Sequence, residues 1–215
     1  MAAEEAQTEK LIKDKAKILF FKKGFLNATT QEIANEAGVN RALIHYYFRS
    51  REQMLEILLD EMLREKKDRV RSILSSGLSF REKIANYIDV VVDHGLKYPY
   101  LDNFLVSEMA RHPEKVKIFC AKDPLRSSDL IRNQLEREVT KGKLGSISAE
   151  HFMVNLISLC NYPLLAKSVI QTVHGMSDAA YRKFLVERKR IIYHTIFNEE
   201  MPEFALSDEL TKTRS

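Results

Sequence analysis

The side chains of this sequence whose types and spacing are best suited to chemistry lie in the segment 29–51. Arg41, Ala42 and His45 would share one side of a short helix, because they lie one and four residues apart. A guanidinium group can donate two hydrogen bonds to a guanine edge, and a small apolar side chain can contact a thymine methyl group. An imidazole can bond a base edge or a phosphate. This pattern therefore predicts the reading of DNA bases in the major groove.

Groups suited to phosphate oxygens flank this side. Thr29 and Glu32 have the spacing of a capping box at a helix start, where free amides and the positive end of the helix dipole attract anions. We expect such contacts to fix the position of the protein on DNA, whereas Arg41 and Gln31 would read bases. The predicted DNA-contacting residues are Thr29, Thr30, Gln31, Asn40, Arg41, Ala42, His45, Tyr46, Tyr47 and Arg51.

Purely structural roles stay open for several of these residues. Thr29 could serve only as a helix cap, and Tyr46 and Tyr47 could serve only as packing residues. An exposed arginine such as Arg41 is, taken alone, an ordinary solvated charge. The surrounding pattern, rather than any one residue, favours DNA contact.

Three short helices would position these side chains. The first begins at a cap at Thr8 and ends at Gly24, the second opens at Thr29, and the third starts near Asn40. Gly38 allows the positive φ of a tight turn between the second and third helices. Residues expected to face the interior of this unit are Leu11, Ile12, Ala16, Leu19, Phe20, Ile33, Ala34, Ala37, Val39, Ile44 and Phe48.

The rest of the chain also follows the helical period, so we predict an all-α fold. Ser50 with Gln53, and Ser79 with Glu82, have the spacing of capping boxes. Gly95 is expected to end the helix that Ser79 begins, and Pro163 to bend a later one. The expected helices run from 51 to about 75, 80 to 95, 99 to 111, 124 to 140, 148 to 171 and 177 to 197, and the tail after 202 is expected to fray.

The segment 24–55 resembles the DNA-binding domain of the TetR family of bacterial regulators. The matching positions are Gly24-Phe25, Thr29-Thr30, Ile33-Ala34, Ala37-Gly38-Val39, Ile44, Phe48, Ser50-Arg51-Glu52 and Leu55. The resemblance implies a homodimer that binds a palindromic operator. It also implies a helical C-terminal domain that holds a small ligand and dimerises through its last two long helices.

The sequence departs from the pattern of that family at three positions. Ala42 replaces a glycine or another small residue, Arg51 replaces a lysine, and His45 replaces a tyrosine. A protonated imidazole would bind phosphate more tightly than a neutral one, so His45 leads us to expect operator affinity to rise at lower pH.

We expect three regions: a helix-turn-helix DNA-binding domain at 1–50, a helical effector-binding and dimerisation domain at 51–200, and a tail at 201–215. The helices at about 148–171 and 177–197 would form the dimer interface, with core packing inside one subunit as the alternative. The candidate effector contacts are Tyr87, His94, Phe104, Met109, Phe119, Asn133, Asn155 and Cys160, each of which could instead be a satisfied core group.

Other classes of protein fit the sequence less well. It lacks the motifs HExxH and GxSxG, a glycine-rich phosphate loop and paired metal-ligand spacing, so we expect neither an enzyme nor a metal or cofactor. The two cysteines, Cys120 and Cys160, suit buried thiols in a reducing cytosol. With no secretory signal and no apolar run of about 18 residues, a cytoplasmic location without membrane contact is expected.

The net charge of +4 is only mildly basic, so DNA binding would come from a local surface. We therefore predict a homodimeric transcriptional repressor that leaves a palindromic DNA operator when a small-molecule effector binds. The alternative is a helical ligand- or partner-binding dimer whose head no longer reads DNA.

Overall fold

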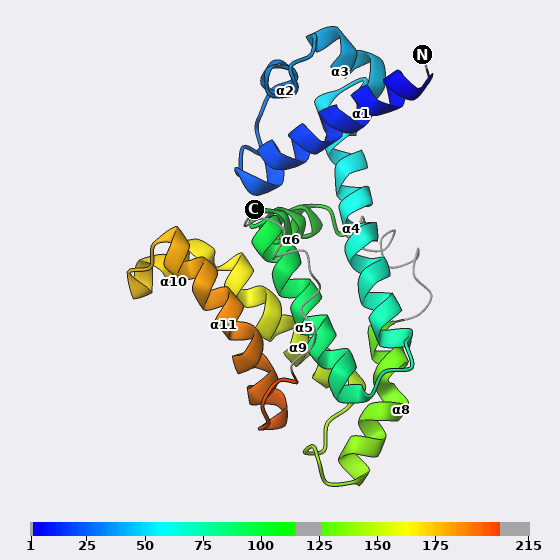
Figure 1. The fold of residues 1–215 in the computed structure, drawn as a ribbon, viewed down its shortest axis with the longest axis vertical. Helices are drawn as coiled ribbons and strands as arrows, with labels where there is room; N and C mark the ends of the chain where they lie inside the picture. Colours follow the sequence, from blue (N-terminus) through cyan, green and yellow to red (C-terminus); the bar gives the residue numbers. More distant parts are fainter. Residues whose placement is uncertain (1, 115–125, 203–215) are drawn as a thin grey trace, which may run out of the picture.

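The computed structural model describes residues 2–114 and 126–202, and within these ranges every regular element is a helix, as predicted. A small helical unit, the head, lies at one end of a larger helical body (Figure 1). The 25-residue helix α4 (Arg51–Ser75) leads from the head along one side of the body.

The head is built from three α-helices and one π-helical turn. Their bounds are α1 Ala2–Lys17, η1 Ile18–Lys22, α2 Thr30–Ala37 and α3 Arg41–Phe48. The predicted start of the first helix at Thr8 is wrong, because α1 already begins at Ala2 and the Thr8 hydroxyl donates to the Glu4 carbonyl inside the helix. Alanine and glutamate before Thr8 are good helix formers, and acidic groups are favourable in a first turn.

The body contains the remaining helices. Their bounds are α5 Phe80–Lys97, α6 Leu101–Arg111, α8 Ser127–Thr140, α9 Ala149–Leu165, α10 Lys167–His174 and α11 Asp178–Phe197. Ser50, Ser79, Ser148 and Ser177 cap the helices that follow them, and Ser79 forms the predicted capping box with Glu82. Helix α5 packs against α4 on one side and against α11 on the other.

Two predicted boundaries in the body are wrong. Gly95 does not end α5, which continues to Lys97; it lies where a Cβ atom would collide with the Leu164 side chain, so it permits α5 and α9 to approach closely. The predicted helix at 148–171 is two helices that meet at Ala166 with a 70° bend. The bend follows Pro163, which has no amide hydrogen to donate and whose carbonyl accepts from the Tyr181 hydroxyl at 2.5 Å.

Two hydrophobic cores share helix α4. Its first half contributes Met54, Leu58 and Met62 to the head core, and its last turn contributes Leu74 to the body core. Leu101, at the start of α6, also belongs to the head core. Helices α4 and α6 therefore connect the body to the head through packed side chains.

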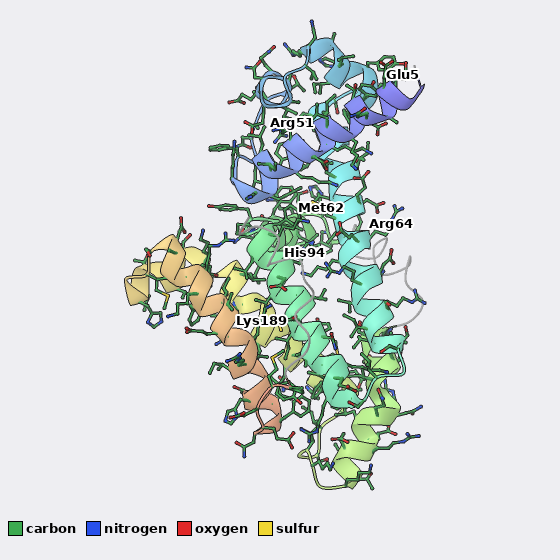
Figure 2. All side chains as sticks on the ribbon, in the orientation of Figure 1. Glu5, Arg51, Met62, Arg64, His94 and Lys189 are labelled. Carbon is green, nitrogen blue, oxygen red and sulfur yellow. The ribbon has the colours of Figure 1, made fainter. Side chains whose placement is uncertain are left out.

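A buried lysine connects two body helices. The Lys189 ammonium group on α11 lies 2.8 Å from Asp89 and 2.7 Å from Asp93, both on α5. Lys189, which is labelled in Figure 2, is buried while its partners are partly exposed, so the two carboxylates compensate the burial of one charge. The pairing fixes the position of α11 along α5.

Among the described residues no single helix is long and apolar enough to cross a membrane. Only α9 and α10 counted together reach that length and composition, and they are the two helices joined by the 70° bend.

Candidate nucleic-acid interface

The turn between α2 and α3 has the geometry that the sequence predicts. Gly38 adopts a left-handed conformation with φ of 67°, and the Val39 amide donates to the Ala34 carbonyl at 3.0 Å. Asn40 then caps α3 by accepting from the Ala42 amide at 2.8 Å. On the inner side of α3, Ile44 and Phe48 are almost completely buried. Helix α3 is therefore held from one side only.

The opposite side of α3 faces solvent at the end of the head remote from the body (Figure 1). Arg41, Ala42, His45 and Tyr46 are all exposed there. A short helix with one buried face and a cationic, hydrogen-bonding outer face is suited to the major groove, which admits a helix and presents acceptors on guanine and adenine.

Arg41 is oriented by a hydrogen bond to the preceding helix. Its Nε donates to the Thr30 hydroxyl of α2 at 3.1 Å. The terminal guanidinium nitrogens have no protein acceptor within residues 2–114 and 126–202, so both remain able to donate to a base edge. Fixing Nε reduces the rotamer freedom that a free arginine would lose on binding.

His45 is fixed by the chain that follows α3. Its Nδ1 lies 2.9 Å from the Arg49 carbonyl oxygen, which can only accept a hydrogen bond. Nδ1 therefore carries the proton in the neutral ring, and Nε2 is left as an acceptor. In this tautomer Nε2 could accept from the amino group of adenine or cytosine. A protonated ring would instead donate to phosphate.

The backbone at Arg49 is unusual for a residue with a side chain. Arg49 has φ of 63° and ψ of −54°, and the Ser50 amide donates to the Phe48 carbonyl across it at 2.6 Å. This is a γ-turn with positive φ, a strained conformation that surrounding structure must hold in place. It turns the chain between α3 and α4, and its carbonyl sets the orientation of His45.

At the start of α2, the predicted capping box is present. The Glu32 amide donates to the Thr29 hydroxyl at 3.2 Å, and the Glu32 carboxylate accepts from the Thr29 amide at 2.7 Å. The hydrogen bond from the Thr29 amide, followed by that from its hydroxyl, holds the pKa of Glu32 below its usual range. Because the Glu32 carboxylate stays ionised beside the start of α2, it competes with a phosphate for the free amides there. Thr29 has a structural role in this capping box whether or not it also contacts DNA.

The remaining predicted contacts differ in how free their side chains are. Tyr46 is 67% exposed, whereas Tyr47 is half-buried against the head core and meets Tyr46 edge-on. Gln31 donates to Asn35 at 2.9 Å. Arg51 donates to the carbonyls of Leu26 and Ala28, so it ties the loop before α2 to the start of α4.

The structure places seven of the ten predicted DNA contacts at the surface and three in half-buried positions. The exposed residues are Thr29, Gln31, Asn40, Arg41, Ala42, His45 and Tyr46, and the half-buried ones are Thr30, Tyr47 and Arg51. Sequence reasoning missed Arg49, an exposed cation beside α3. The charge of Arg49 can be read from the sequence. Its contact with His45, however, is made by the backbone carbonyl, which the residue type does not predict.

The predicted effector contacts differ in their burial. Tyr87, His94 and Cys160 are buried in the body, Phe104 and Met109 are half-buried, Asn133 and Asn155 are exposed, and Phe119 falls outside the described residues. Cys120, expected only to be a buried thiol, also falls outside them. Burial raises the pKa of the Cys160 thiol to about 12, which keeps it protonated and unreactive.

A cavity of about 230 Å³ lies between α4, α6 and α9, and we call it the α4–α6 cavity. Its lining residues are Leu63, Lys66, Lys67, Val70, Asp102, Leu105, Val106, Asn161 and Leu165, none of which was among the predicted effector contacts. Lys66 on α4 donates to Asp102 Oδ1 on α6 at 2.8 Å. Asp102 Oδ2 and Asn161 Oδ1 are buried without a hydrogen-bond partner. The cavity thus combines apolar walls with two unsatisfied acceptors.

His94 on α5 is close to the same ion pair. Neither of its ring nitrogens has a hydrogen-bond partner. Burial, together with the nearby Lys66 charge, lowers the pKa of His94 to about 4, although Asp102 acts in the opposite direction. The ring is therefore neutral near pH 7. Among the described residues no group of three or more His, Cys, Asp or Glu side chains is arranged to hold a metal ion.

Comparison with known proteins supports what the geometry of the head indicates. Residues 12–58 match the family model for bacterial regulatory proteins of the tetR family. Over 90% of its length the chain is 22% identical to the probable HTH-type transcriptional regulator YttP of Bacillus subtilis, of which it covers 95%. It is also 38% identical to the HTH-type transcriptional regulator BetI of Agrobacterium fabrum over 68 residues. These residues make up 31% of this chain and 32% of that protein.

Almost the whole chain shares its fold with a solved protein. The ketosteroid transcriptional regulator KstR2 of Mycobacterium tuberculosis superposes with a TM-score of 0.63 at 15% identity, over 90% of this chain and 96% of that one. The relatives named here are regulators rather than enzymes. Residues 12–58, which make up most of the head, therefore match the tetR family of bacterial regulatory proteins, and almost the whole chain shares the fold of a solved regulator.

Proposed function

We propose that this protein is a homodimeric transcriptional repressor that binds a palindromic operator and is released from it by a small-molecule effector. In this proposal residues 1–50 read DNA, and residues 51–200 dimerise and bind the effector. The observation that carries it is the outer side of α3, where Arg41 is oriented by Thr30 and His45 by the Arg49 carbonyl, so two base-reading groups are preorganised in the absence of DNA.

Dimerisation is supported by the distribution of exposed apolar side chains. Seven of the fourteen large apolar side chains exposed in the described part of the chain lie on α9, α10 and α11: Val154, Ile157, Tyr162, Val169, Val173, Val186 and Ile191. Exposed apolar residues gathered in this way mark association surfaces. A two-fold axis through α9 and α11 would pair equivalent helices and hold two α3 helices about 34 Å apart, the spacing of one DNA turn.

The dimer interface can be tested by charge substitution. We expect Val154→Glu combined with Ile191→Glu to weaken dimerisation at least tenfold. Each substitution occurs in both subunits, so the symmetric interface would bury two copies of each new carboxylate. Light scattering across a concentration series measures the change. Leu78→Glu, at an exposed apolar residue outside these helices, is the matched control. An unchanged dimer in the double variant would contradict this interface.

The α4–α6 cavity is where we propose that the effector binds. A ligand whose hydroxyl or amino groups donate to Asp102 and Asn161 would satisfy both acceptors and compete with Lys66 for Asp102. Because α4 and α6 both pack into the head core, separating them changes the position of α3. The coupling can be no larger than the differential affinity of the effector for the two states, typically about 1–3 kcal/mol. Equal affinity of an effector for free and operator-bound dimer would contradict the coupling.

Selection of binding sites from random DNA with the purified full chain tests the function. The selection is made at near-physiological salt, because phosphate contacts alone give non-specific binding that weakens steeply as ionic strength rises. We expect recovery of an inverted repeat whose half-sites are about one helical turn apart.

The outcomes separate the proposal from its alternative. An inverted repeat identifies the operator and with it the regulated genes. Binding without a shared sequence, lost as salt rises, would contradict sequence-specific regulation and favour a ligand- or partner-binding dimer with a degenerate head.

A further inference from the structure

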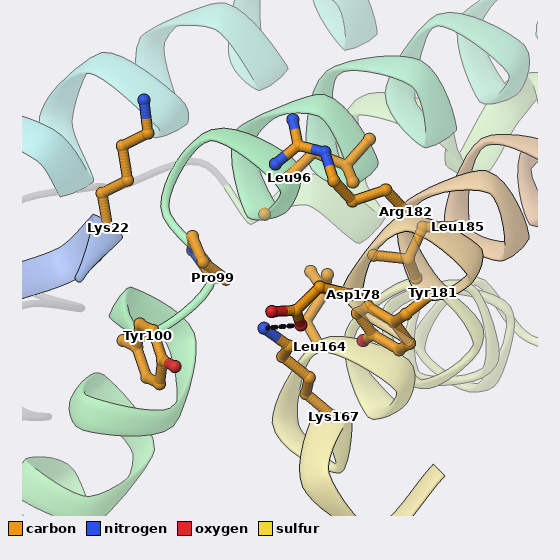
Figure 3. Close-up of a pocket in the computed structure, with 11 residues that line it drawn as sticks. Lys22, Leu96, Pro99, Tyr100, Leu164, Lys167, Asp178, Tyr181, Arg182 and Leu185 are labelled. Atoms are coloured by element: carbon orange, nitrogen blue, oxygen red, sulfur yellow. Dashed lines mark ion pairs between the residues drawn. The ribbon is translucent and has the colours of Figure 1, made fainter. Parts of the chain in front are cut away.

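A second cavity of about 230 Å³ lies where the head meets the body, and we call it the junction cavity (Figure 3). Lys22, the last residue of η1, borders it from the head. The body contributes residues from α5, from the connection to α6, and from α9, α10 and α11. It is lined by a different set of residues from the α4–α6 cavity.

The lining of the junction cavity is positively charged. Lys22, Lys167 and Arg182 come from three different helices and line the cavity together with a single carboxylate, that of Asp178. Asp178 is already engaged, because Lys167 lies 3.0 Å away and Gln171 donates to it at 3.0 Å. These two hydrogen bonds, that of Gln171 first, hold the pKa of Asp178 below its usual range. Within the described ranges, neither Lys22 nor Arg182 has a carboxylate at ion-pair distance.

Two tyrosines position one of these cations. The Lys167 ammonium group lies 5.7 Å from the ring centroid of Tyr100 and 5.8 Å from that of Tyr181. Tyr181 is fixed by its bond to the Pro163 carbonyl, and the Tyr100 hydroxyl points toward the Lys167 side of the cavity (Figure 3). The cation is thus held in place by aromatic faces as well as by Asp178.

The remaining lining is apolar and closely packed. Leu96, Leu164 and Leu185 also line the cavity, and Leu164 fills the space beside Gly95. Because Lys167 is half-buried among these side chains, its ammonium group interacts with a bound anion more strongly than the same group on an open surface would. The volume is below the range of about 300–1,000 Å³ for drug-sized ligands, which favours a small molecule or one acidic group of a larger one.

We propose that the junction cavity binds the carboxylate or phosphate group of a small anionic ligand, with Arg182 and Lys167 as its main partners and Lys22 closing over it from the head. Arg182 offers several donors to an anion, whereas Lys22 is exposed and flexible enough to turn toward it. Occupancy would tie the end of η1 to α10 and α11.

This site would also influence the head through Tyr100. The Tyr100 amide donates to the Phe21 carbonyl at 3.1 Å, and its ring lies over Gly24 at the end of the first helical segment. A ligand held against Tyr100 therefore favours one position of the head relative to the body. The effect on operator affinity rests on the proposed function, but the binding of the anion does not.

The test is titration of the full chain with inorganic phosphate and, separately, with acetate, at ionic strength matched with chloride. Isothermal titration calorimetry measures affinity for the wild type, for Arg182→Gln and for Arg190→Gln, an exposed arginine on the same helix that does not line the cavity. We expect binding of at least one anion with millimolar affinity, weakened at least tenfold in Arg182→Gln and unchanged in Arg190→Gln. The anion that binds identifies the acidic group.

Failure of binding in the wild type, or equal weakening in the two arginine variants, would overturn the site. Lys22→Gln, at an exposed residue, repeats the test if Arg182→Gln is unstable, and we expect it to weaken binding at least threefold. Operator affinity is then measured with and without the anion. If the anion changes operator affinity equally in the wild type and in Arg182→Gln, the regulatory role alone is contradicted. If the wild type binds the anion but binds no operator, the proposed function alone is contradicted.

Discussion

Substitution of Arg41 with alanine is expected to remove the preference of this protein for its proposed operator while leaving the fold intact. Arg41 is exposed on α3, and its one hydrogen bond in the described chain orients it rather than supporting the core. A bidentate arginine–guanine pair contributes about 1–3 kcal/mol of discrimination. A dimer uses two copies, so we expect a loss of about 2–6 kcal/mol, roughly thirtyfold to more than ten-thousandfold in affinity.

Fluorescence anisotropy with operator and scrambled duplexes measures this change, with circular dichroism as the check on folding. Arg64→Ala is the matched control, because Arg64 is an exposed arginine on α4 that bonds Asp60 on its own helix. Operator preference equal to that of the wild type in Arg41→Ala would contradict the base-reading role and favour a degenerate head.

The salt dependence separates a base contact from a phosphate contact. Loss of a phosphate contact lowers the slope of log affinity against log salt by about 1 and weakens binding to all sequences alike, whereas loss of a base contact mainly relaxes specificity. Arg41→Ala should therefore lose specificity, while removal of the exposed Arg49 charge should lower the slope. For Arg49 the substitution is glycine, which suits its positive φ.

Below pH 6.5, the protein is expected to lose stability because of His94. The pKa of a histidine is about 6.5 in an unfolded chain, and burial, with Lys66 nearby, lowers it to about 4 in the folded protein. As pH falls between these values the unfolded chain takes up a proton that the folded protein does not. The free energy of unfolding therefore decreases, by the order of 2–3 kcal/mol between pH 6.5 and pH 4.

The charged groups around His94 agree with a lowered pKa and hence with a loss of stability as pH falls. Lys66, Lys97 and Arg69 oppose a charge on the ring, whereas Asp102 favours one but is already bonded by Lys66. Burial is the largest contribution, and neither ring nitrogen has a partner that would stabilise the charged form.

Urea unfolding at fixed protein concentration and several pH values tests the role of His94. His94→Leu should flatten the pH dependence between pH 6.5 and pH 4 relative to the wild type, because the substituted side chain cannot be protonated. His151→Gln, at an exposed histidine on α9, should leave it unchanged. Carboxylates also contribute to the pH dependence in every variant. The quantity compared is therefore the slope of the free energy of unfolding against pH. An identical slope in wild type and His94→Leu would contradict the assignment.

The amino-acid sequence alone was sufficient for the local features of this protein. The capping boxes at Thr29 and Ser79 and the left-handed Gly38 were all correctly predicted. Such features depend on residues within four positions of one another, so their physics is contained in a short stretch of chain. The apolar faces of α2 and α3 were predictable for the same reason, and they leave one side of α3 outward.

The tertiary structure decided the features that depend on residues far apart in the chain. Gly95 has the residue type of a helix end, but contact with Leu164 makes it a packing position inside α5. Arg51 suits a phosphate contact in the sequence, but the fold brings it to the carbonyls of the loop before α2. The tautomer of His45 depends on a backbone oxygen four residues later, which the γ-turn at Arg49 directs toward it.

The two cavities also depend on residues that are far apart in the chain and could not be predicted from local sequence. Lys66 and Asp102 are 36 residues apart, and Lys22 and Arg182 come from nearly opposite ends of the chain. The period of each helix shows which of its residues face inward, but not which residues of another helix they meet. Those encounters depend on crossing positions and on the path of the connections, which side-chain packing over the whole molecule determines.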